Sequence, residues 1–453
     1  MARAAKVIAA TGLAASALAT AAPAEARVWT LGVDAPSLEA ALAAAADGDE
    51  IRIPPGQWRG GVRVTRSVTL RGEEGAVVDG QGEGTVLEIL APLVVIEGLE
   101  VRGSGNGMEN PRTNVDACLW SSPAADGLEV RNSRFPDCLF GIYVQQSDRA
   151  QIVGNEVHGR PTLREVDRGN GIHLFDASHV VVEGNVIDGT RDGLYISATD
   201  DSRIIGNRIH HVRYAVHYMW SHRNHLEDNE ATDSLAGFAL MQSHDLVVVG
   251  NRMARNRRAG LLARDGQRSV YRHNDIVANG TGIFVYNSIR EHFEENLVAH
   301  NDIGMRIWGA LAVDDVFARN SLIGNAQQIF YFGNRDMRWG EPTEGNHFSD
   351  YLGWDQDHDG VGERPYRVDS LTSNLIYRFP AAALLLRSPA LELLAHLQDG
   401  LPMFRVATVT DTAPITEPTR AVEDARRLQP EGGWHAMSET FSAEADEGHD
   451  LSM

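Results

Sequence analysis

Three histidines and two methionines of the sequence are spaced as soft metal ligands would be. His217 and Met219 are two residues apart, so they lie on the same side of an alternating strand. Met241 follows Met219 by 22 residues, and the same interval separates His222 from His244. Thioether sulfur and imidazole nitrogen suit Cu(I), so we expect these five residues to bind copper. The alternative is that methionines and aromatic residues line a groove that packs against a partner or a C-terminal segment.

A second candidate site is an acidic stretch near residue 355. Asp355, Asp357 and Asp359 alternate and a glycine follows them, as in the first half of a calcium-binding loop. Glu363 is placed to complete the set, whereas Tyr366 stands where an EF-hand has its bidentate glutamate. The stretch predicts either a calcium site of Asp355, Asp357, Asp359 and Glu363 or an acidic turn held by hydrogen bonds.

The His/Met candidates belong to a repeat of about 22 residues. The dipeptide Gly-Asn or a close variant recurs at Asn132, Asn155, Asn185, Asn207, Asn229, Asn251, Asn274, Asn296 and Asn320. Short alternating runs lie between these markers, and 22 residues are too few for a pair of helices. The pattern predicts an all-β fold, a single-stranded right-handed parallel β-helix. An asparagine at each tight corner is expected to adopt left-handed backbone and to bond the amide groups of its neighbour.

Stacking of coils about 4.8 Å apart aligns equivalent residues into rows. One row is apolar in every coil and should point inward: Ile172, Leu194, Val216, Phe238, Leu261, Ile283 and Met305. The residues between inward positions must face outward, and there they are aromatic or sulfur-bearing. We expect the outward-facing set of His173, Phe175, Tyr195, Tyr286 and Trp308 to form a surface for a partner protein.

β-Helices of this type also host polysaccharide lyases, hydrolases and epimerases. Those chemistries need paired carboxylates, or a carboxylate with a basic residue, close together on one face. Asp200-Asp201 is the acidic pair near the rows, and we interpret both residues as part of a turn. The sequence therefore favours a protein that is not an enzyme, with a carbohydrate-active enzyme as the alternative.

The chain is expected to comprise four parts. Residues 1–26 have a basic start, a short apolar run and an A-x-A site, which predict a secretory signal peptide rather than a membrane anchor. Residues 27–335 are assigned to the β-helix, 336–405 to a C-terminal loop and helical cap, and 406–453 to an acidic, unstructured tail.

Three local features complete this organisation. A short helix from Ser37 to Ala45, with Ser37 or Asp34 as its N-cap, should cover the first coil. Extra residues at His158–Asp167 should form a loop that bulges from one coil. The leucine-rich stretch Pro380–Gln398 should form a broken helix that caps the last coil or docks a partner.

Composition narrows the range of partners. With 41 Lys+Arg against 62 Asp+Glu, the formal charge of −21 disfavours nucleic acid and anionic membrane surfaces. No segment after residue 26 is long and apolar enough to span a membrane, so an exported, soluble protein is expected. The two cysteines, Cys118 and Cys138, are about one coil apart, and a disulfide or two buried thiols fit equally well.

The sequence resembles the NosD family, exported β-helical accessory proteins for maturation of nitrous oxide reductase. The resemblance covers essentially the whole mature chain. Its most telling stretches are Cys138–Tyr143, Val216–Met219, Gly237–Met241, Asp355–Tyr366 and Ser388–Ala390.

The resemblance implies a periplasmic copper-handling protein that works with an ABC-type ATPase and its membrane subunit. It further implies nitrous oxide reductase, with its copper–sulfur centre, and a copper chaperone lipoprotein as partners. The chain itself has no Gly-rich Walker loop, so ATP chemistry must belong to a partner.

Overall fold

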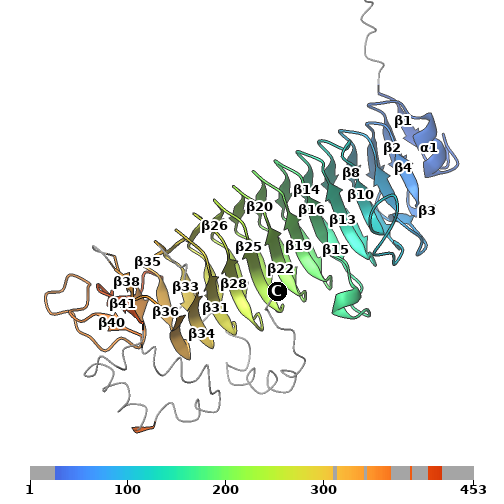
Figure 1. Cartoon of the computed structure of the whole chain (residues 1–453). Coiled ribbons are helices and arrows are strands. Elements are labelled where there is room, and N and C mark those ends of the chain that lie inside the picture. The colour runs from blue at the N-terminus through green and yellow to red at the C-terminus, as the bar shows by residue number, and fades with distance from the viewer. Residues whose placement is uncertain (1–25, 310–313, 341–343, 369–387, 390–406, 421–453) are drawn as a thin grey trace, which may run out of the picture.

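The computed structural model describes residues 26–309, 314–340, 344–368, 388–389 and 407–420. Within them the chain forms a parallel β-solenoid, a rod of stacked coils in which most coils give one strand to each of three long sheets (Figure 1). The predicted parallel β-helix is confirmed. The expected signal peptide, except for its last residue, and nearly all of the expected helix at Pro380–Gln398 lie outside the described residues.

The three long sheets form the sides of the rod. The first contains β1 (Val28–Thr30), β2 (Glu50–Ile53), β5 (Thr69–Gly72), β8 (Val95–Glu97), β11 (Glu129–Arg131), β14 (Gln151–Val153), β17 (Val181–Glu183), β20 (Arg203–Ile205), β23 (His225–Glu227), β26 (Val247–Val249), β29 (Val270–Arg272), β32 (His292–Glu294) and β35 (Val316–Ala318). The second contains β4 (Val62–Val64), β7 (Leu87–Ile89), β10 (Ala117–Ser121), β13 (Phe140–Gln145), β16 (Ile172–Phe175), β19 (Asp192–Ser197), β22 (Tyr214–Met219), β25 (Ala236–Met241), β28 (Ala259–Arg264), β31 (Thr281–Tyr286), β34 (Ile303–Trp308) and β37 (Gln327–Phe332). The third contains β3 (Gly56–Arg59), β6 (Ala76–Asp79), β9 (Glu100–Arg102), β12 (Arg134–Pro136), β15 (Glu156–His158), β18 (Val186–Asp188), β21 (Arg208–His210), β24 (Glu230–Thr232), β27 (Arg252–Ala254), β30 (Asp275–Val277), β33 (Leu297–Ala299), β36 (Ser321–Ile323) and β39 (His347–Phe348).

The apolar interior of the rod is built from aligned rows. Each residue of the predicted inward row pairs in register with its counterpart one coil along, and all are fully buried: Ile172, Leu194, Val216, Phe238, Leu261, Ile283 and Met305. A stack of aromatic rings continues the core through Tyr271, Phe293 and Phe317 to Trp339, with ring centroids 4.4–5.0 Å apart. Each coil therefore depends on its neighbours for burial of its apolar face.

A ladder of buried asparagines runs along one corner of the rod. Its side chains are linked by hydrogen bonds of 2.9–3.1 Å from each Nδ2 to the Oδ1 of the next: Asn155, Asn185, Asn207, Asn229, Asn251, Asn274, Asn296, Asn320 and Asn346. At the C-terminal end, the Asp411 carboxylate accepts from both the backbone N–H and the Nδ2 of Asn346. The predicted bonding between asparagines and neighbouring amides is thus present.

The predicted backbone of these asparagines is wrong. The left-handed residue is the one before each ladder asparagine from Asn155 to Asn320, as at Gly154 (φ 66°) and Asp228 (φ 52°). Asn132 does have a φ of 50°, but it occupies the same corner position as Gly154, and Ser133 starts the ladder by donating its N–H to Asn155. The tight turn must fall one residue early because the asparagine side chain has to point into the rod.

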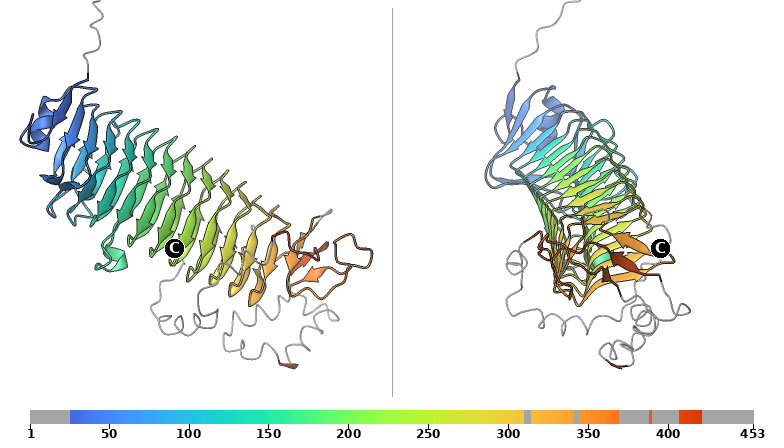
Figure 2. Two further views of the ribbon diagram at one scale, coloured as in Figure 1. Left: turned by 180° about the vertical axis from the view of Figure 1, so that it is seen from behind. Right: turned by 90° about the vertical axis from the view of Figure 1, so that its left-hand side faces the viewer.

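The N-terminal end is closed as expected. Helix α1 (Leu38–Ala44) begins after Ser37, whose side chain accepts the N–H of Ala40, and it buries Leu38 against the core. The loop expected at His158–Asp167 is present, carries the 3₁₀ helix η1 (Glu165–Asp167) and projects from the side of the rod (Figures 1 and 2).

The C-terminal end differs from the expected boundaries. Solenoid strands continue to β39, beyond residue 335, and a small sheet of β38 (Met337–Trp339), β41 (Val409–Asp411) and β40 (Tyr366–Arg367) follows. Strand β41 belongs to the tail that was expected to lack structure, and Arg420 bonds Asp275 at 2.7 Å. The reason is that Asp411 supplies the acceptor that the asparagine ladder lacks at its end.

Two further observations bear on the expectations from the sequence. Cys118 and Cys138 form a disulfide, with Cα atoms 5.6 Å apart, which decides between the two alternatives. Among the described residues, no helix is long and apolar enough to cross a membrane.

Candidate metal site on the second sheet

Two outward rows of the second sheet carry the candidate copper ligands. The histidine row runs through Tyr143, His173, Tyr195, His217, Ala239, Leu262, Phe284, Arg306 and Phe330. The methionine row runs through Gln145, Phe175, Ser197, Met219, Met241, Arg264, Tyr286, Trp308 and Phe332. The register predicted from the sequence is the register of the strands.

His217 is held in one orientation by an acid that the sequence analysis missed. Its Nδ1 lies 2.9 Å from Oδ2 of Asp192, and its ring meets those of Tyr195 and Tyr214 edge to face at about 5 Å. Arg213 clamps the same carboxylate with bonds of 2.8 and 2.6 Å. The sequence signal was an acid directly before the glycine marker, one coil ahead of His217.

The charge of the Asp192 carboxylate favours a hydrogen bond from Nδ1 of His217. Burial opposes ionisation of Asp192, but hydrogen bonds from His217 and Arg213 outweigh it and lower the pKa of Asp192 to about 2. The neutral tautomer of His217 that donates its Nδ1 proton to the ionised Asp192 presents the lone pair of Nε2 to a ligand. Metal-binding histidines commonly use a carboxylate in this way. His217 is only 8 % exposed, so a bound ion would be largely shielded from water.

The methionine pair lies on adjacent strands. Met219 and Met241 are Cα partners, and both side chains are half-buried on the outer face. Neighbouring strands are about 4.8 Å apart. With metal–sulfur bonds of about 2.3 Å, a single ion between two thioethers spans about 4.6 Å, so the spacing of these strands suits one shared Cu(I).

His222 and His244 form a second pair in the same two coils. Their rings stack with centroids 4.0 Å apart, and the N–H of His244 donates to Nδ1 of His222 at 3.1 Å. Desolvation and the neighbouring His244 lower the pKa of His222 and favour the neutral ring. Because Nδ1 accepts the N–H of His244, the proton of this ring is on Nε2, and a metal can bind Nε2 only if that proton moves to Nδ1 and the bond from His244 is given up. Asp200 and Asp201 hold Arg223 with bonds of 2.8–2.9 Å, as expected of turn residues.

The expected partner residues fall into two aromatic groups on either side of the methionine pair. His173 and Tyr195 belong to one continuous group with Tyr143, with centroids 4.2–4.7 Å apart, and Phe175 is exposed beside them. Desolvation lowers the pKa of His173 to about 3, so this ring is neutral. Tyr286 and Trp308 form the other group, with centroids 6.4 Å apart.

The acidic loop brings three of its four predicted ligands together. One carboxylate oxygen from each of Asp355, Asp357 and Asp359 lies within 4.8 Å of the others. Glu363 is outside this group, and its carboxylate accepts the N–H of Gln356 at 3.4 Å instead. Oδ1 of Asp355 is buried without a hydrogen-bond partner among the described residues, so the loop offers an oxygen that a cation would satisfy.

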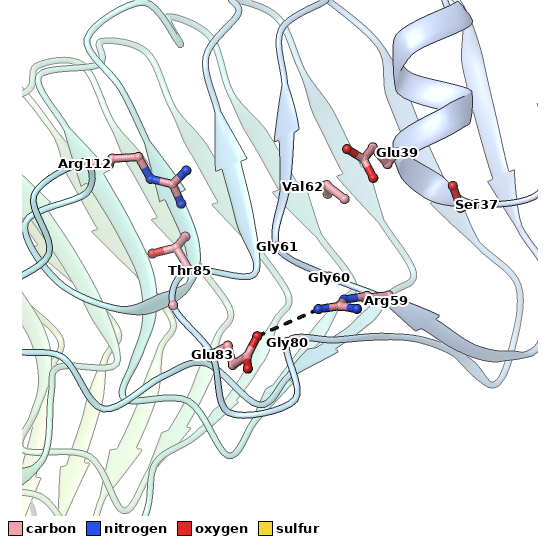
Figure 3. A pocket seen from close by; sticks show the side chains of 11 residues that line it. Ser37, Glu39, Arg59, Gly60, Gly61, Val62, Gly80, Glu83, Thr85 and Arg112 are labelled. Atoms are coloured by element: carbon pink, nitrogen blue, oxygen red, sulfur yellow. Dashed lines mark ion pairs between the residues drawn. The ribbon is translucent and has the colours of Figure 1, made fainter.

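A separate hollow lies at the N-terminal end, between α1 and the first coils. Its lining includes Glu39 and Arg112, together with Arg59 and Glu83, which form an ion pair of 3.8 Å (Figure 3). The lining offers charges of both signs but no histidine or methionine. This hollow therefore does not compete with the second sheet as a soft-metal site.

Comparison with known proteins places these features in a family. The model of the family described as "Periplasmic copper-binding protein (NosD)" matches residues 150–353, which include both rows around the His/Met ligands. The chain is 34 % identical over 379 residues to "Probable ABC transporter binding protein NosD" of Stutzerimonas stutzeri, covering 80 % of this chain and 86 % of that protein. The protein of the same name from Pseudomonas aeruginosa is 35 % identical over 385 residues, covering 82 % and 89 %. The chain belongs to the NosD family.

Among solved structures, the A-module of mannuronan C-5 epimerase AlgE6 from Azotobacter vinelandii is similar to this NosD-family chain. The TM-score is 0.54 at 15 % sequence identity, covering 65 % of this chain and 90 % of that module. At this identity the similarity concerns the fold alone. The β-solenoid is thus shared between NosD proteins and at least one carbohydrate-active enzyme, and the chemistry must be argued from side chains.

Proposed function

We propose that this chain is a periplasmic, non-enzymatic copper-handling protein that takes up Cu(I) as cargo on the second sheet. Met219 and Met241 supply thioethers, and His217, His222 and His244 supply imidazole nitrogens. The observation that carries the proposal is the methionine pair on adjacent coils, next to a histidine whose Nδ1 proton is committed to Asp192. The family's description as periplasmic copper-binding proteins supports both the location and the metal.

The residues suit transfer rather than permanent storage. Thioethers bind Cu(I) without losing a proton, and the hydrogen bond between Nδ1 of His217 and Asp192 can stay in place when Nε2 binds the ion. The half-buried methionines lie at the surface, where an incoming ligand from a partner can replace them. Uptake and release of the ion therefore require little rearrangement of the rigid sheet.

The partners we propose are proteins that meet this face. An ABC-type ATPase and its membrane subunit fit the printed name of the relatives. A copper chaperone lipoprotein would supply the ion, and nitrous oxide reductase, with its copper–sulfur centre, would receive it. The two aromatic groups beside the methionine pair provide the apolar area that such docking needs.

Cu(I) titration under anaerobic conditions tests the site. Replacing both Met219 and Met241 with leucine keeps their volume but removes sulfur. We expect the dissociation constant for Cu(I) to rise at least about 100-fold, because loss of an outer partner of a metal ligand alone costs about 10–100-fold. A competition assay with a chromogenic Cu(I) chelator measures the change.

Met108→Leu is the matched control, because Met108 is exposed in the loop before β10, four coils from β22 and its Met219. It should bind Cu(I) like the unmodified chain. Equal affinity and stoichiometry in the control and in the double variant would rule out the methionine pair as the site.

A carbohydrate-active enzyme is the second candidate. It is favoured by one observation: His217, oriented by Asp192, lies against Tyr195 on an outward face and could serve as a general base. Turnover of an acidic polysaccharide that disappears in His217→Asn but persists in the double methionine variant would support this function over copper handling.

We further propose that the acidic loop binds calcium through Asp355, Asp357 and Asp359, with Glu363 reaching the ion by a local rearrangement. Asp357→Asn removes one charge from this cluster and should weaken Ca²⁺ or Tb³⁺ binding about tenfold or more, because carboxylates dominate such sites. Terbium luminescence measures this, with Asp336→Asn outside the loop as the control. Unchanged terbium binding in Asp357→Asn would mean that the loop is an acidic turn.

A further inference from the structure

A second group of metal-binding side chains lies on the third sheet, outside the His/Met site. Asp188 ends β18 and His210 ends β21, and the two residues are Cα partners on adjacent coils. His211 is the next residue of the chain. Among the described residues, these three are one of two groups in which at least three His, Cys, Asp or Glu side chains bring ligand atoms together, the other being the acidic loop.

The three ligand atoms form a nearly equilateral triangle. Oδ1 of Asp188 lies 3.1 Å from Nδ1 of His210 and 3.0 Å from Nδ1 of His211, and the two Nδ1 atoms are 3.0 Å apart. The imidazole planes are almost perpendicular, at 87°. Ligands around one ion at bonds of about 2.0–2.1 Å are separated by about 2.9 Å at right angles and about 3.3 Å in a tetrahedron, so the triangle has the size of one face of a coordination shell.

The backbone makes this convergence possible. Successive residues of a strand point to opposite faces, so two neighbouring histidines do not normally meet. His211 has a φ of 52°, in the left-handed region that is uncommon for residues other than glycine. The turn swings its side chain back toward His210 instead of away from it.

Protons alone do not satisfy this triangle. If one histidine donates from Nδ1 to the other, the accepting nitrogen also faces Asp188 with its lone pair, which repels the carboxylate oxygen. If both nitrogens donate to Oδ1 of Asp188, the contact between the two nitrogens has two donors and no acceptor. A single cation bound by lone pairs of all three atoms avoids both of these arrangements.

The surroundings suit a bound ion. His158, one coil before Asp188, has its Nδ1 4.0 Å from the other carboxylate oxygen of Asp188 and can add a further nitrogen. On the side of the next coil, Asp233 lies one coil after His211, and its carboxylate accepts a bond of 2.6 Å from Arg255. The side chain of His211 is 66 % exposed, which leaves an open path for the ion and for water as a further ligand.

We propose that Asp188, His210 and His211 form a second metal site, which takes a divalent transition-metal ion of the Cu(II)/Zn(II) class. Two nitrogens and one carboxylate oxygen are borderline-to-hard ligands, in contrast to the thioethers of the second sheet, and Cu(II) binds such sets most tightly in the first-row series. The proposal does not depend on the Cu(I) function, because it uses other residues on another side of the rod.

Electron paramagnetic resonance with Cu(II) as the probe tests the site in the full chain, purified without a histidine tag. One equivalent of Cu(II) should give a spectrum with nitrogen splitting from two imidazoles. The double variant His210→Asn/His211→Asn should lose this spectrum, and the dissociation constant should rise more than about 100-fold. His225→Asn is the control, because His225 pairs with Glu227 on the first sheet, and in the described part of the chain no third His, Cys, Asp or Glu joins them.

Asp188→Asn provides a variant with nearly unchanged shape, and circular dichroism establishes folding of each protein. The Asp188→Asn variant should bind Cu(II) more weakly, while the Cu(I) affinity of the methionine site should stay unchanged. A Cu(II) spectrum without imidazole nitrogen in the unmodified chain, or equal Cu(II) binding by the unmodified chain and the double variant, would overturn the proposal.

Discussion

Asn229→Ala is expected to reduce the free energy of unfolding by about 3–5 kcal/mol. The Asn229 side chain makes four buried hydrogen bonds of 2.8–3.0 Å: it accepts two from Asn207 and donates one each to Ile204 and Asn251. Alanine removes the buried acceptor of the Asn207 backbone N–H and of one Nδ2 hydrogen of Asn207, and it removes the side-chain donor to Ile204 and Asn251. Chemical denaturation followed by circular dichroism measures the loss.

The control is Asn334→Ala, which truncates an exposed asparagine between β37 and β38. We expect its free energy of unfolding to change by less than about 0.5 kcal/mol. Similar midpoints for Asn229→Ala and the unmodified chain would show that the ladder is not a main source of stability.

Glu291→Gln is expected to make the protein more stable above neutral pH. Glu291 is fully buried, and burial together with the nearby Asp315 raises its pKa from 4.5 to about 8. A carboxyl whose pKa is higher in the folded chain stabilises the fold below pH 4.5, and this stability is lost as the pH rises through about 8. Glutamine stays neutral, so the variant should gain up to about 4 kcal/mol over the unmodified chain at pH 8.

Thermal unfolding between pH 5 and pH 9 measures this difference. The two proteins should approach each other in stability at the acid end and diverge at the alkaline end. Glu294→Gln, on the same strand but with a half-exposed side chain, should leave the pH profile unchanged. Parallel profiles for Glu291→Gln and the unmodified chain would contradict the expected destabilisation by ionised Glu291 at high pH.

The sequence alone predicted the coils, their register and the position of the His/Met residues, because each depends on a strict interval. Residues such as Ile172 and Leu194 repeat at that interval and point inward. The residues that alternate with them along each strand must therefore point outward. The backbone conformation at the corners was harder to predict from the sequence. Both an asparagine and the glycine before it recur, and only the direction of the side chain shows which of them, as at Gly154 and Asn155, takes the left-handed turn.

The surroundings of the ligands were harder to predict for a different reason. Alignment on the glycine marker describes the second sheet, so it revealed His217 and Met219 but not the corner that brings Asp192 and Arg213 to His217. The third sheet follows a different position of the coil. His210 and His211 therefore read as ordinary neighbours until the turn at His211 is known. Contacts across corners depend on backbone torsions that the repeat does not encode.

Asp411 has a consequence for the length of the rod. Every asparagine of the ladder both accepts from the coil before it and donates to the coil after it, so the pattern has no internal reason to stop. Asp411 stops it, since both of its oxygens accept, from Asn346 and from the backbone of Ala413. A carboxylate has no hydrogen to offer a further coil. The segment around residue 411 thus ends the asparagine ladder at this corner of the rod.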